Sequence, residues 1–529
     1  EHALPPDNFQ EDPEPARAHR TSPTNLGLYL LSTVAAHDFG WIGILDTAER
    51  LEATLQTMDK LRRVRGHFCN WYDTRDLRPL EPIYVSTVDS GNLAGHLIAL
   101  AQACRELIHR SAFGPQVLEG VTDALELLLE SAEQAEHSQR TQTVTAEQLR
   151  EAAQGMVAAL EDPPTVVSEW AQRLEELGTQ AEQLLDIART ISYRIDDGPS
   201  SEVRVWARAV RDSIRSHARD IETALLFESL DVPQRAETGL SHRLSDLALR
   251  AEAMVQAMDF RFLLDPSRKI FSIGYRVADN VLDPSCYDLL ASEARLASFV
   301  AIAKGDASPR HWFRLGRALT PVGRGAALVS WSGSMFEYLM PRLVMRQPAH
   351  RLLDLTCRLV VGLQIRYGAD RKVPWGVSES AYNVRDVHLT YQYSDFGVAG
   401  LGFKRGLGED IVVAPYATAL AAMVNPSAAV KNFARLEETG ARGAYGFYEA
   451  LDYTPSRLPE DDQVAVVRAD MSHHQGMTIV ALGNVVHDGV TRRRFHAHPL
   501  VRAAELLLQE RTPRAVAVAR PRAEEVRVT

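Results

Sequence analysis

Ten acidic residues of this sequence lie in or beside short segments that are rich in aromatic and small polar residues. In WGVSESAYN (residues 375–383), Glu379 stands between two serines, four residues after Trp375 and three before Tyr382. In LLASEARL (residues 289–296), Glu293 also has small side chains on both sides. Two carboxylates that flank a glycosidic bond are the usual means of cleaving it, one as proton donor and the other as nucleophile or base. The ten acidic residues are Asp38, Asp73, Asp89, Glu293, Glu337, Glu379, Asp386, Asp395, Glu449 and Asp452.

The aromatic residues of the same segments could form the walls of a sugar-binding groove. The face of an aromatic ring stacks on the C–H groups of a sugar, while Asp, Asn, Arg and His bind the hydroxyl groups. The alternative is that these rings belong to the hydrophobic core. Their repeated occurrence beside polar residues favours the groove. The candidates are Trp41, Trp71, Tyr72, Trp331, Trp375, Tyr382, Tyr391, Tyr393, Tyr448 and Tyr453.

Each carboxylate also has an alternative structural role. Asp73, in NWYDTRDL, could bind Arg75, and Glu337, in MFEYLMP, could pair with an arginine. Glu293 is predicted to lie on a helix, where a local pair with arginine is common. The small neighbours of Glu293 and Glu379 nevertheless leave room for a bulky ligand. From the residues alone, the shortlist of catalytic candidates is unranked and consists of Glu293, Glu337, Glu379 and Glu449.

Motifs for other kinds of site are missing from the sequence. It contains no GxxxxGK[ST] phosphate loop, no GxGxxG and no GxSxG nucleophile motif. His473 and His474 are adjacent and would face different directions on a helix, so a polar contact is favoured over a metal ligand. The four cysteines are far apart and lack CxxC spacing, so we expect reduced thiols. No metal and no cofactor are expected. The cysteines are Cys69, Cys104, Cys286 and Cys357.

The charge of the chain restricts its partners. The net charge of −11 over 529 residues argues against nucleic acid or an anionic membrane, because binding phosphates needs a basic face. A neutral, polyhydroxylated ligand fits better. No apolar run approaches the roughly 20 residues that span a bilayer. The sequence begins EHALPPDNFQ, without Met, and we expect it to be a segment of a longer protein.

Helical periodicity dominates the sequence outside the aromatic and polar segments. Apolar residues recur at spacings of three and four, and period-two alternation is scarce. We therefore expect an all-α fold, an α/α toroid, whose loops bring the site to one rim, with short hairpins near residues 270–276 and 390–403. The expected order is an extended lead-in (1–23), the first part of the barrel (24–110), an Ala/Glu/Leu-rich helical subdomain or outer helices (111–258), the remainder of the barrel with the catalytic loops (259–515) and a tail (516–529).

Several long segments resemble the middle region of bacterial cyclic β-1,2-glucan synthases. Among them are GHFCNWYDTRDLRPLEPIYVSTVDSGNLAGHL, CYDLLASEARLASF, SWSGSMFEYLMP, VPWGVSESAYN and SHHQGM. The resemblance covers nearly the whole chain apart from residues 111–258. It implies the cyclisation domain of these synthases, glycoside hydrolase family 189, with an (α/α)6 barrel. The implied activity is anomer-retaining transglycosylation, in which linear β-1,2-glucan is cleaved and rejoined into a ring through a covalent glucosyl-enzyme.

The resemblance also implies roles and partners. It makes Glu379 the nucleophile and Glu293 the acid/base. The partners are linear β-1,2-glucan, as substrate and acceptor, and two flanking domains of the parent chain, a membrane-embedded glycosyltransferase and a phosphorylase-like domain. The implied location is the cytoplasmic face of the bacterial inner membrane, with the isolated segment soluble. The residues expected to bind substrate are Asp38, Trp41, Trp71, Tyr72, Asp73, Asp89, Asn92, Tyr287, Arg295, Trp331, Glu337, Tyr338, Trp375, Ser378, Tyr382, Asn383, Tyr391, Tyr393, Asp395, Glu449, Tyr453, His473, His474 and Gln475.

Three alternative functions remain open at the level of the sequence. The first is an endo-β-1,2-glucanase, which would transfer the cleaved end to water. The second is a glucan-binding scaffold without chemistry. The third is an enzyme with another substrate, such as an α-glucan, because similar barrels occur in glucoamylases.

Overall fold

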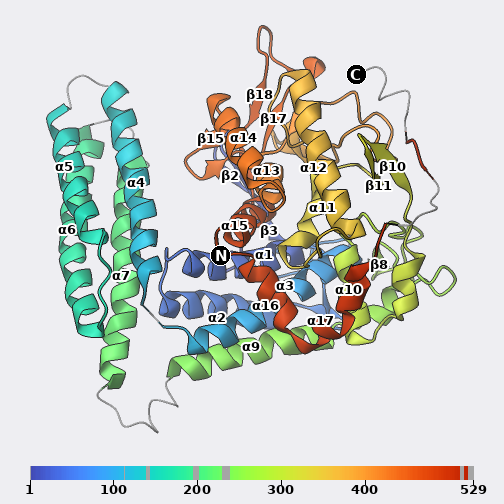
Figure 1. Cartoon of the computed structure of the whole chain (residues 1–529), viewed down its shortest axis with the longest axis horizontal. Helices are drawn as coiled ribbons and strands as arrows, with labels where there is room; N and C mark the ends of the chain where they lie inside the picture. The colour runs from blue at the N-terminus through green and yellow to red at the C-terminus, as the bar shows by residue number, and fades with distance from the viewer. Residues whose placement is uncertain are drawn as a thin grey trace. The chain divides into compact units, whose positions relative to one another are not determined.

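The computed structural model describes residues 2–111, 113–138, 143–194, 202–228, 239–512 and 518–521, and the statements below concern these residues (Figure 1). The chain divides into two compact units. The first consists of Glu1–Ser32, Thr54–Ala103 and Leu249–Thr529, and the second of Thr33–Ala53 and Cys104–Ala248. None of the described helices combines the length and the apolar composition that crossing a membrane requires.

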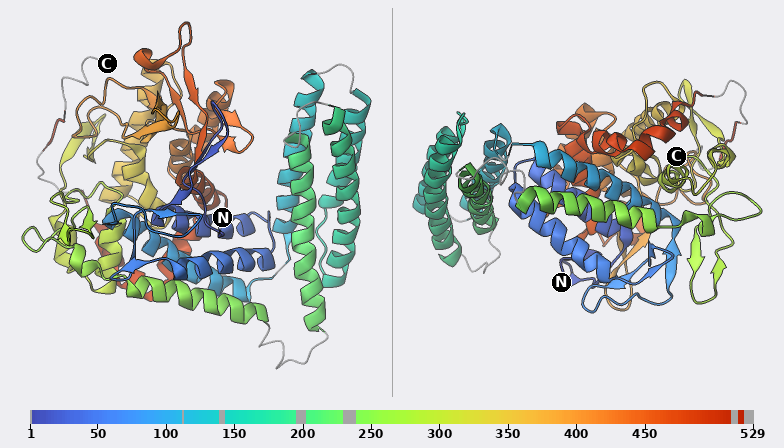
Figure 2. Two further views of the ribbon diagram at one scale, coloured as in Figure 1. Left: turned by 180° about the vertical axis from the view of Figure 1, so that it is seen from behind. Right: turned by 90° about the horizontal axis from the view of Figure 1, so that it is seen from below.

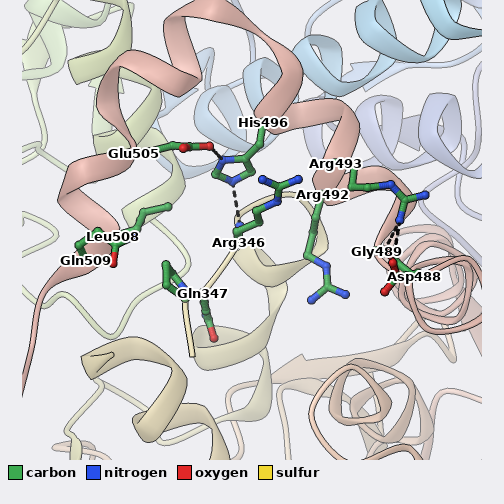
Figure 3. A pocket seen from close by; sticks show the side chains of 11 residues that line it. Arg346, Gln347, Asp488, Gly489, Arg492, Arg493, His496, Glu505, Leu508 and Gln509 are labelled. Atoms are coloured by element: carbon green, nitrogen blue, oxygen red, sulfur yellow. Dashed lines mark hydrogen bonds and ion pairs between the residues drawn. The ribbon is translucent and has the colours of Figure 1, made fainter. Parts of the chain in front are cut away.

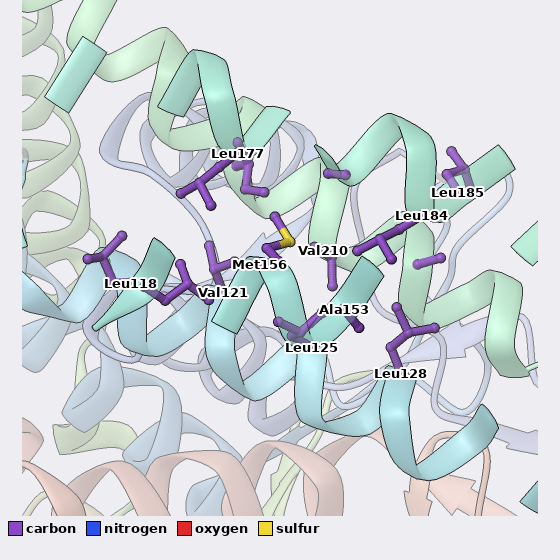
Figure 4. Close-up of a cluster of buried hydrophobic side chains, with 14 of the residues drawn as sticks. Leu118, Val121, Leu125, Leu128, Ala153, Met156, Leu177, Leu184, Leu185 and Val210 are labelled. Carbon is purple, nitrogen blue, oxygen red and sulfur yellow. The ribbon is translucent and has the colours of Figure 1, made fainter. Parts of the chain in front are cut away.

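The second unit contains a four-helix bundle. Its helices are α4 (Pro115–Ser138), α5 (Thr143–Leu160), α6 (Val167–Arg194) and α7 (Glu202–Glu228). Each helix packs against the next, and α4 also packs against α7, which closes the ring. Apolar residues at helical spacing supply the core, in which Leu125, Met156, Leu177 and Val210 have no exposed surface (Figure 4). Most of the Ala/Glu/Leu-rich segment of the sequence therefore forms this bundle.

The first unit contains most of the remaining helices. Within it, α13 packs against α11, α14 and α15, and α10 packs against α17; Figure 2 shows these helices from behind and from below. Proline at the first turn starts α13 and α14, and Gly305, in the left-handed conformation, ends α10. The bounds are α1 Pro23–Asp38, α2 Ile44–Lys60, α3 Thr87–His109, α9 Gly239–Ala257, α10 Arg295–Lys304, α11 Met335–Leu339, α12 Leu352–Arg371, α13 Pro415–Ala422, α14 Pro426–Glu438, α15 Ser472–Val486, α16 Val490–Ala497 and α17 Pro499–Ala504.

The strands are short and form antiparallel pairs or triplets. The triplets are β19-β1-β2, β14-β17-β18 and β7-β8-β9, and the pairs are β10-β11, β12-β13, β15-β16, β3-β6 and β4-β5. The bounds are β1 Asn8–Gln10, β2 Ala16–Arg17, β3 Arg20–Thr21, β4 Arg63–Val64, β5 His67–Phe68, β6 Tyr72–Asp73, β7 Tyr84–Ser86, β8 Gly274–Arg276, β9 Val281–Leu282, β10 Leu319–Val322, β11 Gly325–Leu328, β12 Ser380–Arg385, β13 Tyr391–Ser394, β14 Val412–Val413, β15 Arg442–Gly443, β16 Gly446–Phe447, β17 Ala450–Asp452, β18 Ala465–Val467 and β19 Ala469–Met471.

The all-α prediction is confirmed, with differences in detail. The hairpin expected near residues 390–403 is formed instead by β12 and β13, and β8 is the middle strand of a triplet. The extended lead-in contains β1, which pairs with β19 in the register Asn8↔Met471. This pairing brings the N-terminal segment beside the start of α15. Most of the predicted tail, residues 516–529, lies outside the described residues.

Candidate active site

Two cavities of the first unit have Glu293 and Glu379 in common. Their volumes are about 570 Å³ and about 350 Å³, within the range typical of sites for small ligands. Both carboxylates line both cavities, so the cavities adjoin each other at this pair. Predicted site residues in the wall of the larger cavity are Tyr287, Glu293, Trp331, Glu337, Glu379 and Asp395. Those in the wall of the smaller cavity are Trp71, Asp89, Asn92, Glu293, Glu379, Tyr393 and His473.

Glu293 lies in a turn directly before α10, so the prediction that it lies on a helix is wrong. The hydroxyl of Ser292 accepts the N–H two residues further on, at 3.2 Å, and this local bond competes with helical hydrogen bonding. The buried guanidinium of Arg295 donates to the carbonyl of Ser292 at 2.9 Å and to two carbonyls of α11. Arg295 therefore fixes the turn against α11 and does not face the substrate space.

The surroundings of Glu293 favour its protonated form. Burial raises the pKa of Glu293 to about 7, and the negative charge of Glu337 contributes to the rise. The backbone N–H of Glu293 and a weak hydrogen bond from the Ser292 hydroxyl to Oε2, at 3.3 Å, oppose the rise. A carboxyl group that keeps its proton near neutral pH can serve as a general acid.

Glu337 is a carboxylate saturated with hydrogen-bond donors. It caps α11 in a reciprocal capping box with Ser334. It also accepts the hydroxyls of Ser330 at 2.8 Å and Ser332 at 2.6 Å and the backbone N–H of Trp331 at 3.0 Å. So many donors oppose the rise in its pKa that burial causes. Glu337 is thus a buried structural anion, and no arginine in the described part of the chain pairs with its carboxylate.

Glu379 lies directly before β12 on a backbone held from several sides. The side-chain amide of Gln364 donates to the carbonyl of Val377 at 2.8 Å and accepts its N–H at 2.9 Å. The hydroxyl of Tyr416 donates to the carbonyl of Glu379 at 2.9 Å and lies 2.8 Å from the hydroxyl of Ser378. The position of the Glu379 carboxylate is therefore set by α12 and α13.

The carboxylate of Glu379 receives one strong hydrogen bond. The hydroxyl of Tyr393 donates to its Oε1 at 2.9 Å. Burial raises the pKa of Glu379 well above its usual range, and the nearby charges of Asp395 and Glu293 raise it further. The Tyr393 bond acts in the opposite direction because it stabilises the ionised form.

A buried polar chain continues behind Tyr393. Nε2 of His474 lies 3.4 Å from the Tyr393 hydroxyl, and its Nδ1 lies 2.9 Å from Oε1 of Glu449. Burial raises the pKa of Glu449 to about 7 and lowers the pKa of His474 to about 3. Since the Tyr393 proton points to Glu379, we assign the ring proton of His474 to Nε2, facing Tyr393. With this assignment, Glu449 donates to His474, His474 donates to Tyr393, and Tyr393 donates to Glu379.

The walls of the cavities carry groups that suit a sugar chain. Trp331, at the larger cavity, is 61% exposed, which leaves its face available for stacking. At the smaller cavity, Asp89 accepts the hydroxyl of Thr24 at 2.6 Å, and Arg20 lies over the ring of Trp71 at 4.8 Å. Among the described residues, no group of three or more His, Cys, Asp or Glu side chains could hold a metal ion.

Two predicted contact residues near the start of the first unit bind other protein groups. Asp73 accepts two hydrogen bonds from the Arg75 guanidinium, at 3.0 and 2.6 Å, as its structural alternative anticipated. The ring of Tyr72 is fully buried, and its hydroxyl donates to the carbonyl of Arg62 at 2.6 Å. Neither residue lines the two cavities.

Two further predicted residues belong to the second unit. Asp38 accepts the guanidinium of Arg110 at 2.9 Å. Trp41 stacks on a phenylalanine and donates from its ring nitrogen to Asp123 at 2.8 Å. The remaining predicted residues of the first unit lie outside the walls of both cavities. Arg295, Ser378 and His474 are hydrogen-bonded to wall residues, and Tyr338 and Glu449 bind Arg295 and His474 respectively. The others are Trp375, Tyr382, Asn383, Tyr391, Tyr453 and Gln475.

Sequence reasoning missed some residues of the site. Asp7 and Arg20 line the smaller cavity, although their segment was predicted to be a simple lead-in. Tyr416 orients Glu379 and stacks on His474 with 3.6 Å between ring centroids. In the sequence it follows a proline at a helix start and has no polar neighbour to mark it.

The sequence and the fold are similar to those of known proteins that act on glucans. Residues 286–499 match the family described as "Putative glucoamylase". The chain is 47% identical over 520 residues to the cyclic beta-(1,2)-glucan synthase NdvB of Rhizobium meliloti (strain 1021), a match that covers 97% of this chain and 18% of that protein. The chain thus spans less than a fifth of this relative.

Two solved structures share the fold. The endo-beta-1,2-glucanase of Chitinophaga pinensis, in complex with sophorotriose and glucose, has a TM-score of 0.58 and 11% identity, over 96% of this chain and 92% of that chain. The endo-beta-1,2-glucanase of Talaromyces funiculosus, with sophorose, has a TM-score of 0.58 and 11% identity, over 98% and 90%. These likenesses concern the fold and confirm the expected helical toroid.

Proposed function

We propose that this chain is an anomer-retaining β-1,2-glucan transglycosylase. The premise is that it belongs to the family of this segment of cyclic β-(1,2)-glucan synthases. It would cleave linear β-1,2-glucan and join the new end to a hydroxyl of another glucan or of the same chain, which closes a ring. The observation that carries the proposal is the placement of Glu293 and Glu379 in the walls of two adjoining cavities.

The two carboxyl groups share one proton in the state that reacts. Each raises the cost of ionising its neighbour, so the pair titrates as a unit. The Tyr393 hydroxyl donates to Glu379 at 2.9 Å, whereas the saturated anion Glu337 acts on Glu293. These two contacts favour the negative charge on Glu379 and the proton on Glu293, and they act against the burial of Glu379, which raises its pKa. This is the distribution that a nucleophile and a general acid need.

The reaction then proceeds in two displacements. Glu293 donates its proton to the glycosidic oxygen while a carboxylate oxygen of Glu379 bonds to the anomeric carbon, and the bond to the leaving glucan breaks. In the second step, ionised Glu293 removes the proton of an acceptor hydroxyl, whose oxygen displaces Glu379. Two inversions at one carbon give retention, which requires the carboxyl groups to lie about 5–5.5 Å apart in the complex.

Transfer to a sugar instead of water requires binding on both sides of the cleavage point. The larger and the smaller cavity would hold the two parts of the glucan on either side of the carboxylate pair. Sugar rings in both cavities would exclude water from the glucosyl-enzyme. In the parent chain, a glycosyltransferase domain would supply linear glucan, and a phosphorylase-like domain would trim it.

The test is incubation with linear β-1,2-glucan, followed by mass spectrometry and anomeric NMR of the products. We expect cyclic and lengthened β-1,2-glucans, and almost complete loss of both with Glu379→Gln or Glu293→Gln. Glu438→Gln, which changes an exposed glutamate of α14, is the matched control and should behave as wild type.

Each alternative function gives a different product pattern. Only shortened chains with a free reducing end would identify a hydrolase instead. Unchanged glucan that still binds the protein would identify a scaffold. Products with inverted anomeric configuration would refute the double displacement, and full activity of Glu379→Gln would refute the assignment of the nucleophile.

A further inference from the structure

A third cavity of the first unit has no connection to the carboxylate pair. Its volume is about 480 Å³, and it shares no lining residue with the two cavities that contain Glu293 and Glu379. Three segments form it: residues 346–348, residues 488–496 at the start of α16, and residues 505–509 (Figure 3). Arginine is its most frequent lining residue.

The acidic groups in this cavity are already bound to other partners. Glu505 contacts Nδ1 of His496, whose Nε2 accepts the backbone N–H of Arg346 at 2.9 Å. Asp488 lies 3.6 Å from the guanidinium of Arg493, which also donates to the carbonyls of residues 487 and 488. These contacts, drawn in Figure 3, pair both carboxylates of the cavity wall with groups other than Arg346 and Arg492.

Two guanidinium groups are left without a counter-ion. Among the described residues, the side chains of Arg346 and Arg492 have no hydrogen-bond acceptor and no carboxylate within ion-pair distance. Arg492 is partly buried, and its pKa is lowered to about 10 by burial and by the positive charges of Arg342, Arg346 and Arg493, which outweigh the opposite effect of Asp488. Mutual repulsion of this kind is relieved when an anion binds between the cations.

The cavity wall also contains a buried donor without a partner. The side-chain nitrogen of Gln347 lacks an acceptor within the described part of the chain, as does Nε of Arg342, which lies outside the wall. Buried donors without a partner are rare and destabilising. In the first turn of α16, the N–H groups of Thr491 and Arg492 donate to Asn484 and are therefore not available to an anion. An anion would therefore be bound by the guanidinium groups.

We propose that this cavity binds a small phosphorylated ligand, with Arg346 and Arg492 on the phosphoryl oxygens. The planar guanidinium matches the spacing of two phosphoryl oxygens. The cavity is larger than a bare phosphate requires, and a sugar-sized group attached to the phosphate would fill the rest. Gln509 could bind its hydroxyls and Leu508 could cover its apolar face.

Calorimetric titration of the whole chain tests this proposal without depending on any catalytic activity. The probes are glucose 6-phosphate, inorganic phosphate and unphosphorylated glucose. We expect one binding site for glucose 6-phosphate, binding at least about tenfold weaker in Arg492→Gln and in Arg346→Gln, as expected for the loss of a charged hydrogen bond, and no binding of glucose at this site. Arg310→Gln, which removes an exposed arginine outside the cavity, is the matched control for total charge.

The outcomes separate the possible sources of the phosphoryl group. Equal affinity for inorganic phosphate and the sugar phosphate would mean that free phosphate is the ligand, while tighter binding of the sugar phosphate would mean that the attached group is recognised. Either result supports phosphoryl binding. The proposal is refuted if no probe binds at millimolar concentration, or if Arg310→Gln weakens binding as much as the two cavity variants. Arg346 is exposed, so its variant keeps the test valid even if Arg492→Gln fails to fold.

Discussion

Replacing Tyr393 by phenylalanine isolates the hydrogen bond that favours the negative charge on Glu379. The variant removes only the hydroxyl, which donates to Oε1 of Glu379 at 2.9 Å, and keeps the ring. A hydrogen bond to a charged group contributes roughly 1.5–3 kcal/mol, and about 1.36 kcal/mol corresponds to one pKa unit. Tyr393 is 39% exposed, so water can partly replace the lost donor, and the lower end of the range applies.

The effect has a defined sign. The lost donor stabilised the ionised form of Glu379, so the pKa of this group rises in the variant. The acid limb of the pH profile of kcat/KM, which reports ionisation of the nucleophile, should therefore move to higher pH by about one unit. The alkaline limb, which reports the proton on Glu293, should stay in place. The bell-shaped profile becomes narrower, and the rate on its acid side falls about tenfold.

The assay is the rate of product formation from linear β-1,2-glucan measured across the pH range. Tyr445→Phe removes an exposed tyrosine hydroxyl outside the cavities and should leave both limbs unchanged. A uniform loss of rate in Tyr393→Phe, with both limbs where the wild type has them, would show that Tyr393 holds the structure or the substrate but does not tune Glu379. A shift of the acid limb to lower pH would refute the assigned direction of the hydrogen bond.

Four other perturbations have defined outcomes. With azide and an aryl β-glucan donor, Glu379→Ala should form an α-glucosyl azide, because azide replaces the nucleophile. Glu293→Ala should form a β-glucosyl azide, because azide replaces the acceptor. NMR distinguishes the two products. Glu337→Gln removes a charge that raises the pKa of Glu293, so the alkaline limb of kcat/KM should move to lower pH. Trp331→Ala should raise KM more than it lowers kcat, since the exposed ring is expected to bind substrate and transition state alike. Leu177→Ala, in the fully buried core of the bundle, should lower the free energy of unfolding by about 2–5 kcal/mol, measured by chemical denaturation.

The fold class and a shortlist of carboxylates could be predicted from the sequence. Helical periodicity is a local property, and small flanking residues mark a carboxylate with free space beside it. The shortlist of Glu293, Glu337, Glu379 and Glu449 remained unranked because the sequence does not show which carboxylates are satisfied by other protein groups. In the structure, Glu337 accepts three serine hydroxyls and several backbone N–H groups, and Glu449 is bonded to Nδ1 of His474. Only the three-dimensional arrangement shows that Glu337 and Glu449 are weaker candidates for the catalytic pair than Glu293 and Glu379.

The same limit explains the misplaced contact residues. Trp41 stands among small, polar and aromatic residues much as Trp71 does, but Trp41 donates to Asp123, 82 residues away, whereas Trp71 lines the smaller cavity. Composition does not distinguish a ring that packs against a distant helix from a ring in a groove. Conversely, Tyr416 contacts Glu379 from a helix whose sequence is mostly apolar.

The charges of the cavities imply a division of ligands. Glu337, Glu379 and Asp395 line the larger cavity beside the protonated Glu293, and the negative potential of these three carboxylates stabilises the positive charge that develops on the sugar ring in the transition state. The same potential repels a phosphorylated sugar, whereas the unpaired arginines of the third cavity attract it. A neutral glucan and an anionic sugar would thus be directed to different places on one unit. If glucose 6-phosphate inhibits glucan transfer, it should therefore do so without competing with the glucan, and Arg346→Gln should relieve the inhibition while leaving KM for the glucan unchanged.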